Sequence, residues 1–153
     1  MTIILSPASR KSTFYAKYLK DKICVHVNRN ILKNVNKCIS VLQTALSNNQ
    51  SVYIDNTHPT IESRQVFISI AKQYSVPVIG LHFTADDWLC RHLDVFRSIT
   101  CKVDLLPPVA FRSFHSKYQP PTISEGFEII HMVDFTGQFS SEKDVDLFTS
   151  YLF

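Results

Sequence analysis

Short apolar runs alternate with segments of helical periodicity along almost the whole chain. Buried strands are predicted at 3–5, 24–27, 52–54, 77–83 and 127–135. Helices are expected at 12–20, 31–46, 60–74 and 86–98, with a last helix from residue 141. Alternation of this kind favours a mostly parallel sheet with helices on both faces, so the sequence predicts an α/β domain with three layers.

The segment after the first predicted strand resembles the end of a phosphate-binding loop. Lys11, Ser12 and Thr13 match the last positions of the pattern G-x-x-x-x-G-K-[ST], in which backbone N–H groups surround a phosphate. Glycines in that pattern let the backbone approach the phosphate closely. Larger residues occupy those positions here, namely Leu5, Ala8 and Arg10. The sequence therefore predicts a degenerate phosphate site. The alternative is that Lys11 is a solvated lysine and that Ser12 and Thr13 cap the helix.

Polar residues follow each of the first three predicted strands. These residues are Lys11, Asn30 and Asp55. Because the carboxyl ends of parallel strands meet at one edge of a sheet, where ligands bind, we expect the three to converge. Asp55 is a candidate metal or water ligand, or alternatively a cap of the turn that follows it. His26 lies within an alternating strand and is interpreted as a core histidine rather than a catalyst.

Charge is unevenly distributed along a chain whose net charge is only +3. Residues 1–50 carry eight Lys or Arg side chains against one acidic residue, a balance of +7. Residues 118–153 carry six acidic side chains against one lysine, a balance of −5. A basic end on such a chain favours a polyanionic partner such as nucleic acid, the alternative being a solvated helix face.

A second basic segment lies between the proline pairs at 107–108 and 120–121, where an irregular conformation is expected. Residues 111–118 alternate aromatic and basic side chains, including Arg112 and Lys117. Such a segment can stack bases while its cations pair with phosphates. The alternative is that its rings cover the core.

Composition excludes several classes of protein. The apolar share is 45%, and no apolar run approaches the length of a membrane span. The apolar start is too short for a secretory signal, so secretion is not expected. Four scattered cysteines predict reduced thiols in a nuclear or cytoplasmic protein, and no clustered ligands suggest a metal centre.

Several motifs together resemble the kinase domain of the polynucleotide kinase 3′-phosphatases, DNA-repair enzymes that phosphorylate 5′-hydroxyl ends. Residues 25–30 read V-H-V-N-R-N and resemble the family's V-H-V-N-R-D. Residues 52–59 resemble its strand followed by D-N-T-N-P, and 121–127 resemble P-T-L-x-E-G-F. Shorter matches keep the same register at 63–64, 75–77, 91–92 and 96–97. The resemblance spans about 5–133. It implies one P-loop kinase-like domain over 1–153, without the family's phosphatase or FHA domains.

The departures from the family fall on positions to which the resemblance assigns chemistry. The acidic residue of N-R-D is the general base toward the 5′-hydroxyl, and Asn30 stands there. An amide cannot accept that proton as a carboxylate does. Two arginines expected near phosphates correspond to Val66 and Val95. The resemblance therefore implies a pseudokinase, in which Asn30 marks the degenerate base position and Asp55 remains a candidate catalytic residue.

The remaining candidate residues are cationic or hydroxylic. The resemblance implies a degenerate ATP site formed by Lys11, Ser12, Thr13 and Arg91. Nucleic-acid-binding residues are expected at Arg29, Arg64, Arg112 and Lys117, although Arg64 could instead be a surface helix residue. No cofactor is expected unless the site still works, in which case ATP and Mg²⁺ are implied.

The leading hypothesis is a degenerate kinase-like domain that binds polynucleotide ends or acts as a scaffolding subunit. The resemblance implies a nuclear DNA repair or recombination complex, with DNA ends and a protein as partners and no membrane. One alternative is a divergent ATP-dependent 5′-hydroxyl kinase in which Asp55 or a water replaces the base. The other is a purely protein-binding subunit.

Overall fold

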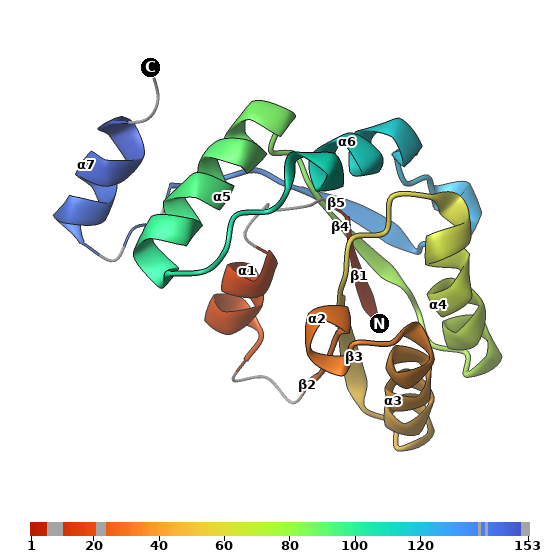
Figure 1. The fold of residues 1–153 in the computed structure, drawn as a ribbon. Coiled ribbons are helices and arrows are strands. Elements are labelled where there is room, and N and C mark those ends of the chain that lie inside the picture. The colour runs from red at the N-terminus through yellow and green to blue at the C-terminus, as the bar shows by residue number, and fades with distance from the viewer. Residues whose placement is uncertain (6–10, 21–23, 138, 140, 151–153) are drawn as a thin grey trace.

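A five-stranded parallel sheet forms the centre of the structure, a computed structural model (Figure 1). The structure describes residues 1–5, 11–20, 24–137, 139 and 141–150, without the side chains of 3–5 and 11–13. The strands run in the order β2-β3-β1-β4-β5 across the sheet. Their bounds are β1 Thr2–Leu5, β2 Cys24–Asn28, β3 Ser51–Asp55, β4 Ile79–Phe83 and β5 Ile129–Val133. The predicted strands are confirmed, although the last two are shorter than expected.

Helices connect successive strands and begin at recognisable caps. Their bounds are α1 Lys11–Tyr18, α2 Arg29–Leu32, α3 Val35–Ser47, α4 Ile61–Gln73, α5 Asp87–Cys101, α6 Pro108–Lys117 and α7 Glu142–Ser150, with a 3₁₀ turn η1 at Ile123–Glu125. Thr60 and Ser63 form a capping box at the start of α4, and Asp86 caps α5 by accepting the Leu89 backbone N–H. Within the described residues, no helix is long and apolar enough to cross a membrane.

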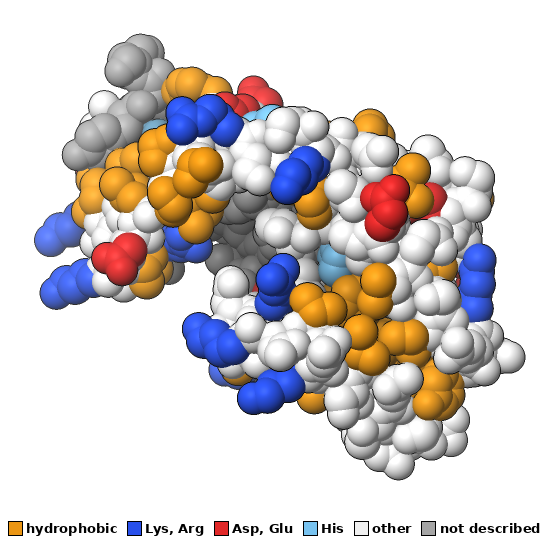
Figure 2. Space-filling model, turned by 45° about the vertical axis from the view of Figure 1, so that its right-hand side comes forward, with side chains coloured by type: hydrophobic (Ala, Val, Ile, Leu, Met, Phe, Trp, Pro, Cys, Tyr) orange, Lys and Arg blue, Asp and Glu red, His pale blue; other side chains and the backbone are white. Residues whose placement is uncertain are grey.

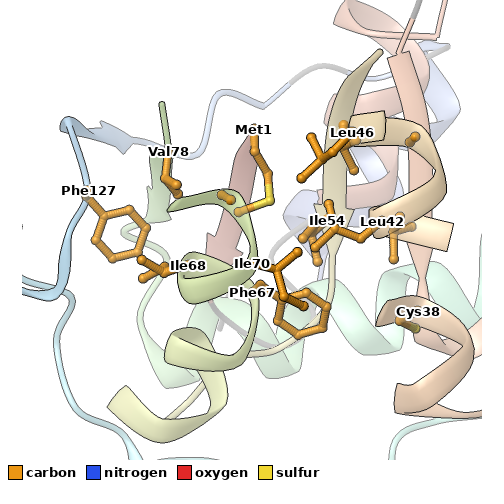
Figure 3. Packing of buried hydrophobic residues seen from close by; sticks show 14 residues of the cluster. Met1, Cys38, Leu42, Leu46, Ile54, Phe67, Ile68, Ile70, Val78 and Phe127 are labelled. Atoms are coloured by element: carbon orange, nitrogen blue, oxygen red, sulfur yellow. The ribbon is translucent and has the colours of Figure 1, made fainter. Parts of the chain in front are cut away.

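The larger core lies between the sheet and the pair α3 and α4 (Figure 3). Leu42 of α3, Ile68 of α4 and Ile54 of β3 are all fully buried in this one cluster. Apolar residues recur along both helices at the spacing that places them on one face. Burial of this apolar surface is the main contribution to the stability of this half of the domain.

The opposite face of the sheet is covered by α1. Phe14 packs edge-on against Phe83 of β4, with ring centroids 5.6 Å apart, and Tyr53 of β3 is fully buried beside them. A third cluster joins α5 to α7 through Phe96 and Phe148. Helices therefore lie on both faces of the sheet, and the prediction of a three-layer α/β domain is confirmed.

Residues 108–117 form the helix α6, so the prediction of an irregular segment is wrong. Proline is tolerated in the first turn of a helix because the N–H groups there have no intrahelical acceptor. Pro108 occupies such a position at the start of α6. Phe111 and Phe114 are buried, so these two rings cover the core and are not available to stack on bases.

Candidate functional site

The carboxyl ends of β1, β2 and β3 lie side by side, because these strands are neighbours in a parallel sheet. Asp55 ends β3, and its side chain is only 3% exposed. Its Oδ2 lies 3.2 Å from His26 Nε2 and accepts a hydrogen bond from Asn28 Nδ2 at 3.0 Å. His26 and Asn28 share one face of β2, because side chains two residues apart in a strand point the same way. The three side chains thus form a polar cluster at this edge.

Aromatic rings cover the inner side of this cluster. Tyr15 of α1 stacks on His26 with ring centroids 3.9 Å apart and an interplanar angle of 20°. Tyr53 lies 5.2 Å from the Tyr15 ring. Burial raises the pKa of the Tyr53 phenol, and the negative charge of Asp55 raises it further, so the phenol stays neutral. His26 is therefore part of the polar cluster as well as of the core, which agrees with its interpretation as a core histidine whose Nε2 has a polar partner.

Asn30, which stands at the general-base position in the resemblance, lies in α2, immediately beyond β2. Asn28 caps this helix, because its Oδ1 accepts the backbone N–H of Asn30 at 2.8 Å. The backbone N–H of Arg29 donates to Asn56 Oδ1 at 2.7 Å, which connects the helix to the turn after β3. The side chains of Asn30 and Arg29 are both exposed. An amide is therefore presented at this position, next to a cation.

The described part of the segment that resembles a phosphate-binding loop lies at the same edge of the sheet. Lys11 begins α1, which follows β1, and β1 is the neighbour of β3. The side chains of Lys11, Ser12 and Thr13, and residues 6–10 with Ala8 and Arg10, lie outside the described part of the chain. The backbone thus places Asp55 at the end of β3, and Lys11 and Asn30 after the neighbouring strands β1 and β2, while the ATP-binding assignment stays a prediction.

Arg91 connects α5 to α6. Its Nε donates to Asp87 Oδ2 at 2.7 Å, and its guanidinium carbon lies 4.7 Å from the centre of the Phe111 ring. The hydrogen bond from Arg91 lowers the pKa of the Asp87 carboxyl, and a hydrogen bond from His115 adds to the effect. These contacts fix α6 against α5, and the assignment of Arg91 to a nucleotide stays a prediction.

Arg64 does not lie on the surface, so its assignment to nucleic acid is wrong. The side chain is fully buried, and its guanidinium pairs with Glu125 through two hydrogen bonds of 2.6 and 2.8 Å. A phosphate cannot reach a guanidinium that is enclosed in this way. The alternative of a surface helix residue is also wrong, for the same reason.

Arg112 and Lys117 are exposed on α6, and Arg29 is exposed on α2. Figure 2 shows Lys and Arg side chains at several places on one face of the molecule. Exposed cations attract a polyanion from solution. Their nucleic-acid-binding role stays a prediction.

Three residues of the site were missed from the sequence. Asn28 and Asn56 hold Asp55 and α2 in place, as described above. His82, near the end of β4, lies with its Nε2 2.6 Å from the hydroxyl oxygen of Tyr118. Burial lowers the pKa of His82, and the charge of Arg64 lowers it further. Alternation along β2 could have indicated Asn28, which is two residues beyond His26.

Comparisons with known proteins support the resemblance. No family model matches the sequence. The chain is 42% identical over 129 residues to a bifunctional polynucleotide phosphatase/kinase of Schizosaccharomyces pombe, a match that covers 84% of this chain and 32% of the relative. A viral protein assigned to the same class, from Acanthamoeba polyphaga mimivirus, is 31% identical over 138 residues, covering 88% and 33%. The chain thus spans about a third of the length of both relatives.

A solved structure shows the same fold. Kti12 from Chaetomium thermophilum, in complex with ADP-AlF3, superposes with a TM-score of 0.66 at 14% identity, covering 98% of this chain and 96% of that one. Together with the curated relatives, this confirms the resemblance drawn from the motifs and the P-loop kinase-like fold.

Proposed function

We propose that this relative of the bifunctional polynucleotide phosphatase/kinases binds the 5′ ends of polynucleotides and has lost most or all of its kinase activity. The carrying observation is the exposed amide of Asn30 at the position of the general base. General acid–base catalysis contributes about 10²–10⁴-fold to rate, and an amide supplies none of it. A kinase that keeps its fold and its cations but lacks its base retains binding without turnover.

Asp55 is poorly placed to replace the missing base. A general base must come within about 3 Å of the proton that it removes. The Asp55 carboxylate is buried, and its Oδ2 already contacts His26 and Asn28. This arrangement supports a structural role for Asp55 and argues against the alternative of a divergent kinase that uses it as base.

The exposed cations on α2 and α6 support the binding part of the proposal. Arg29 and Arg112 are on the surface, and the net charge of residues 1–50 is +7. Contacts of Lys and Arg with phosphates supply most of the non-specific affinity for nucleic acid. We place the chain, as an end-binding or scaffolding subunit with a protein partner, in a nuclear DNA repair or recombination complex. This setting follows from the resemblance.

A single-turnover assay tests the loss of activity. The protein is mixed in excess with an oligonucleotide bearing a 5′-hydroxyl, ATP and Mg²⁺, and Lys11→Ala is the control. We expect equal, background levels of phosphorylated product from both proteins. Product that forms with the natural sequence and disappears with Lys11→Ala would show an active kinase and refute the pseudokinase proposal.

Fluorescence anisotropy tests binding, with an oligonucleotide labelled at its 3′ end so that the 5′-hydroxyl stays free. We expect binding at low salt that weakens steeply as salt is added. Arg29→Ala and Arg112→Ala should each reduce the affinity. Arg97→Ala is the matched control, since Arg97 is also exposed but pairs with Asp94. An absence of binding at low salt would favour the purely protein-binding subunit.

A further inference from the structure

One guanidinium inside the protein hydrogen-bonds to three separate segments. Arg64 is the largest of the fully buried side chains. Its Nε and Nη2 donate to the two carboxylate oxygens of Glu125. Its Nη1 donates to the carbonyl oxygens of His58, at 3.0 Å, and Gln119, at 2.9 Å. Charge pairing therefore uses one side of the guanidinium, and the other side joins two stretches of backbone.

The two carbonyl groups belong to segments that flank the candidate site. His58 lies in the turn after Asp55, and the same turn contains Asn56, which accepts the backbone N–H of Arg29. Gln119 follows α6, the helix that carries two of the predicted nucleic-acid-binding residues. A change in the position of Arg64 would therefore move the β3 edge of the site relative to α6.

Two further hydrogen bonds join the same segments. The backbone N–H of Gln119 donates to the carbonyl oxygen of Pro59 at 2.7 Å. The side-chain oxygen of Gln119 accepts the backbone N–H of Ile61 at 2.9 Å. Arg64 thus lies in a network that connects the turn after β3, the start of α4 and the end of α6.

We propose that Arg64 and Glu125 form a clamp that fixes the turn 56–60 relative to α6 and so positions the site for a polynucleotide end. The statement about the ligand rests on the proposed function. A buried ion pair is often no more stabilising than apolar residues of the same volume, so stability alone does not account for this one. A planar guanidinium, by contrast, fixes the directions of several hydrogen bonds at once. Arg64 is a positioning residue, since the ligand cannot touch it.

Arg64→Lys tests the clamp, because lysine keeps the charge beside Glu125 but cannot reach the carboxylate and both carbonyls together. Amide hydrogen exchange, followed by NMR, reports the N–H groups of Gln119 and Arg29, whose acceptors lie in the turn. We expect both to exchange at least about tenfold faster, while amides in α3 change less than about threefold. Arg97→Lys, the same substitution at an exposed arginine, should change neither. Unchanged exchange at Gln119 and Arg29 in Arg64→Lys would overturn the clamp.

Glu125→Gln provides a second variant should Arg64→Lys fail to fold. The amide keeps the shape of the side chain but places an N–H group against the donors of Arg64, so the guanidinium loses one of its two acceptors. The same two amides should then exchange faster, again relative to α3. Exchange equal to that of the natural sequence would overturn the clamp.

Anisotropy with the 3′-labelled oligonucleotide tests the positioning of the site. We expect Arg64→Lys to lower the affinity about fivefold or more, with Arg97→Lys unchanged. Faster exchange with unaltered affinity would overturn the positioning role. If the natural sequence does not bind the oligonucleotide, the proposed function fails, and the ligand part of this inference fails with it. Amide hydrogen exchange still decides whether the clamp exists.

Discussion

Replacing Asn28 by alanine removes two hydrogen bonds of the candidate site at once. The side-chain Nδ2 donates to the buried carboxylate of Asp55, and the Oδ1 caps α2 by accepting the backbone N–H of Asn30. Asn28 itself is buried, so water does not readily replace either partner. We therefore expect a marked loss of stability, accompanied by a displaced α2.

The magnitude follows from the two contacts. Loss of an asparagine cap costs about 1 kcal/mol. A hydrogen bond to a charged group contributes about 1.5–3 kcal/mol. Asn28→Ala should therefore lower the free energy of unfolding by about 2.5–4 kcal/mol, a large share of the roughly 5–15 kcal/mol typical of a domain.

Urea denaturation, followed by circular dichroism, measures this change, and the chain offers a matched control. Asn34 caps α3 in the same way, with its Oδ1 accepting the Asn36 backbone N–H at 2.7 Å, but it is exposed and has no carboxylate partner among the described residues. Asn34→Ala should cost only about 1 kcal/mol. The difference between the two variants isolates the contact with Asp55. Equal losses in both would refute the reasoning, because the buried contact would then contribute nothing.

Three further outcomes are expected. Because its pKa is lowered, His82 takes up a proton less readily in the folded protein than in the unfolded chain. The neutral side chain therefore contributes fully to the free energy of unfolding above about pH 6.5, and this contribution is lost as the pH falls below that value. Urea midpoints at pH 7.5 and 5.5 should therefore differ less in His82→Gln than in the natural sequence, and an equal difference in both would contradict this. Gly126→Ala should lower the melting temperature, with a loss of about 1 kcal/mol or more, because Gly126 has a φ of 111° and an added Cβ would lie 3.2 Å from Ile68; an unshifted transition would contradict this. Leu42→Ala should cost about 2.7–5 kcal/mol in urea, and Leu105→Ala, at an exposed leucine, less than about 0.5; similar losses would mean that the core between α3 and the sheet is poorly packed.

Much of the fold could be predicted because its strands are short apolar runs separated by clear helical periodicity. The positions of Asn30 and Asp55 at the carboxyl ends of adjacent strands follow from the same pattern in a parallel sheet. The register of β2 and β3, which pairs Asn28 with Asp55, could not be predicted, because β3 is buried on both faces and its apolar run does not single out one pairing. Only that register brings the amide to the carboxylate.

The burial of Arg64 was missed although its position on α4 contained the signal. Phe67, Ile68 and Ala71 follow it at three, four and seven residues, so all four lie on one face of the helix. A charged residue on an apolar face indicates a buried partner. Glu125 is 61 residues away in the sequence, and the sequence alone does not reveal such a long-range pair.

The error at α6 has a similar origin. Proline pairs on both sides of a segment favour an irregular conformation, yet proline also fits the first turn of a helix. Phe111, Phe114 and Tyr118 recur at three and seven residues, which is helical spacing. Composition alone leaves open whether these rings stack on bases or cover the core, whereas the periodicity predicts an amphipathic helix with its rings turned inward.

The central place of β1 in the sheet has a consequence for biosynthesis. Of the five strands of the sheet, β1 is the first to be translated, but its neighbours β3 and β4 end only at Asp55 and Phe83. The backbone of this apolar segment therefore has no partner strands until much of the domain has been translated. Such a nascent strand is a natural target for chaperones, and slow elongation before residue 83 would lengthen its exposure to aggregation.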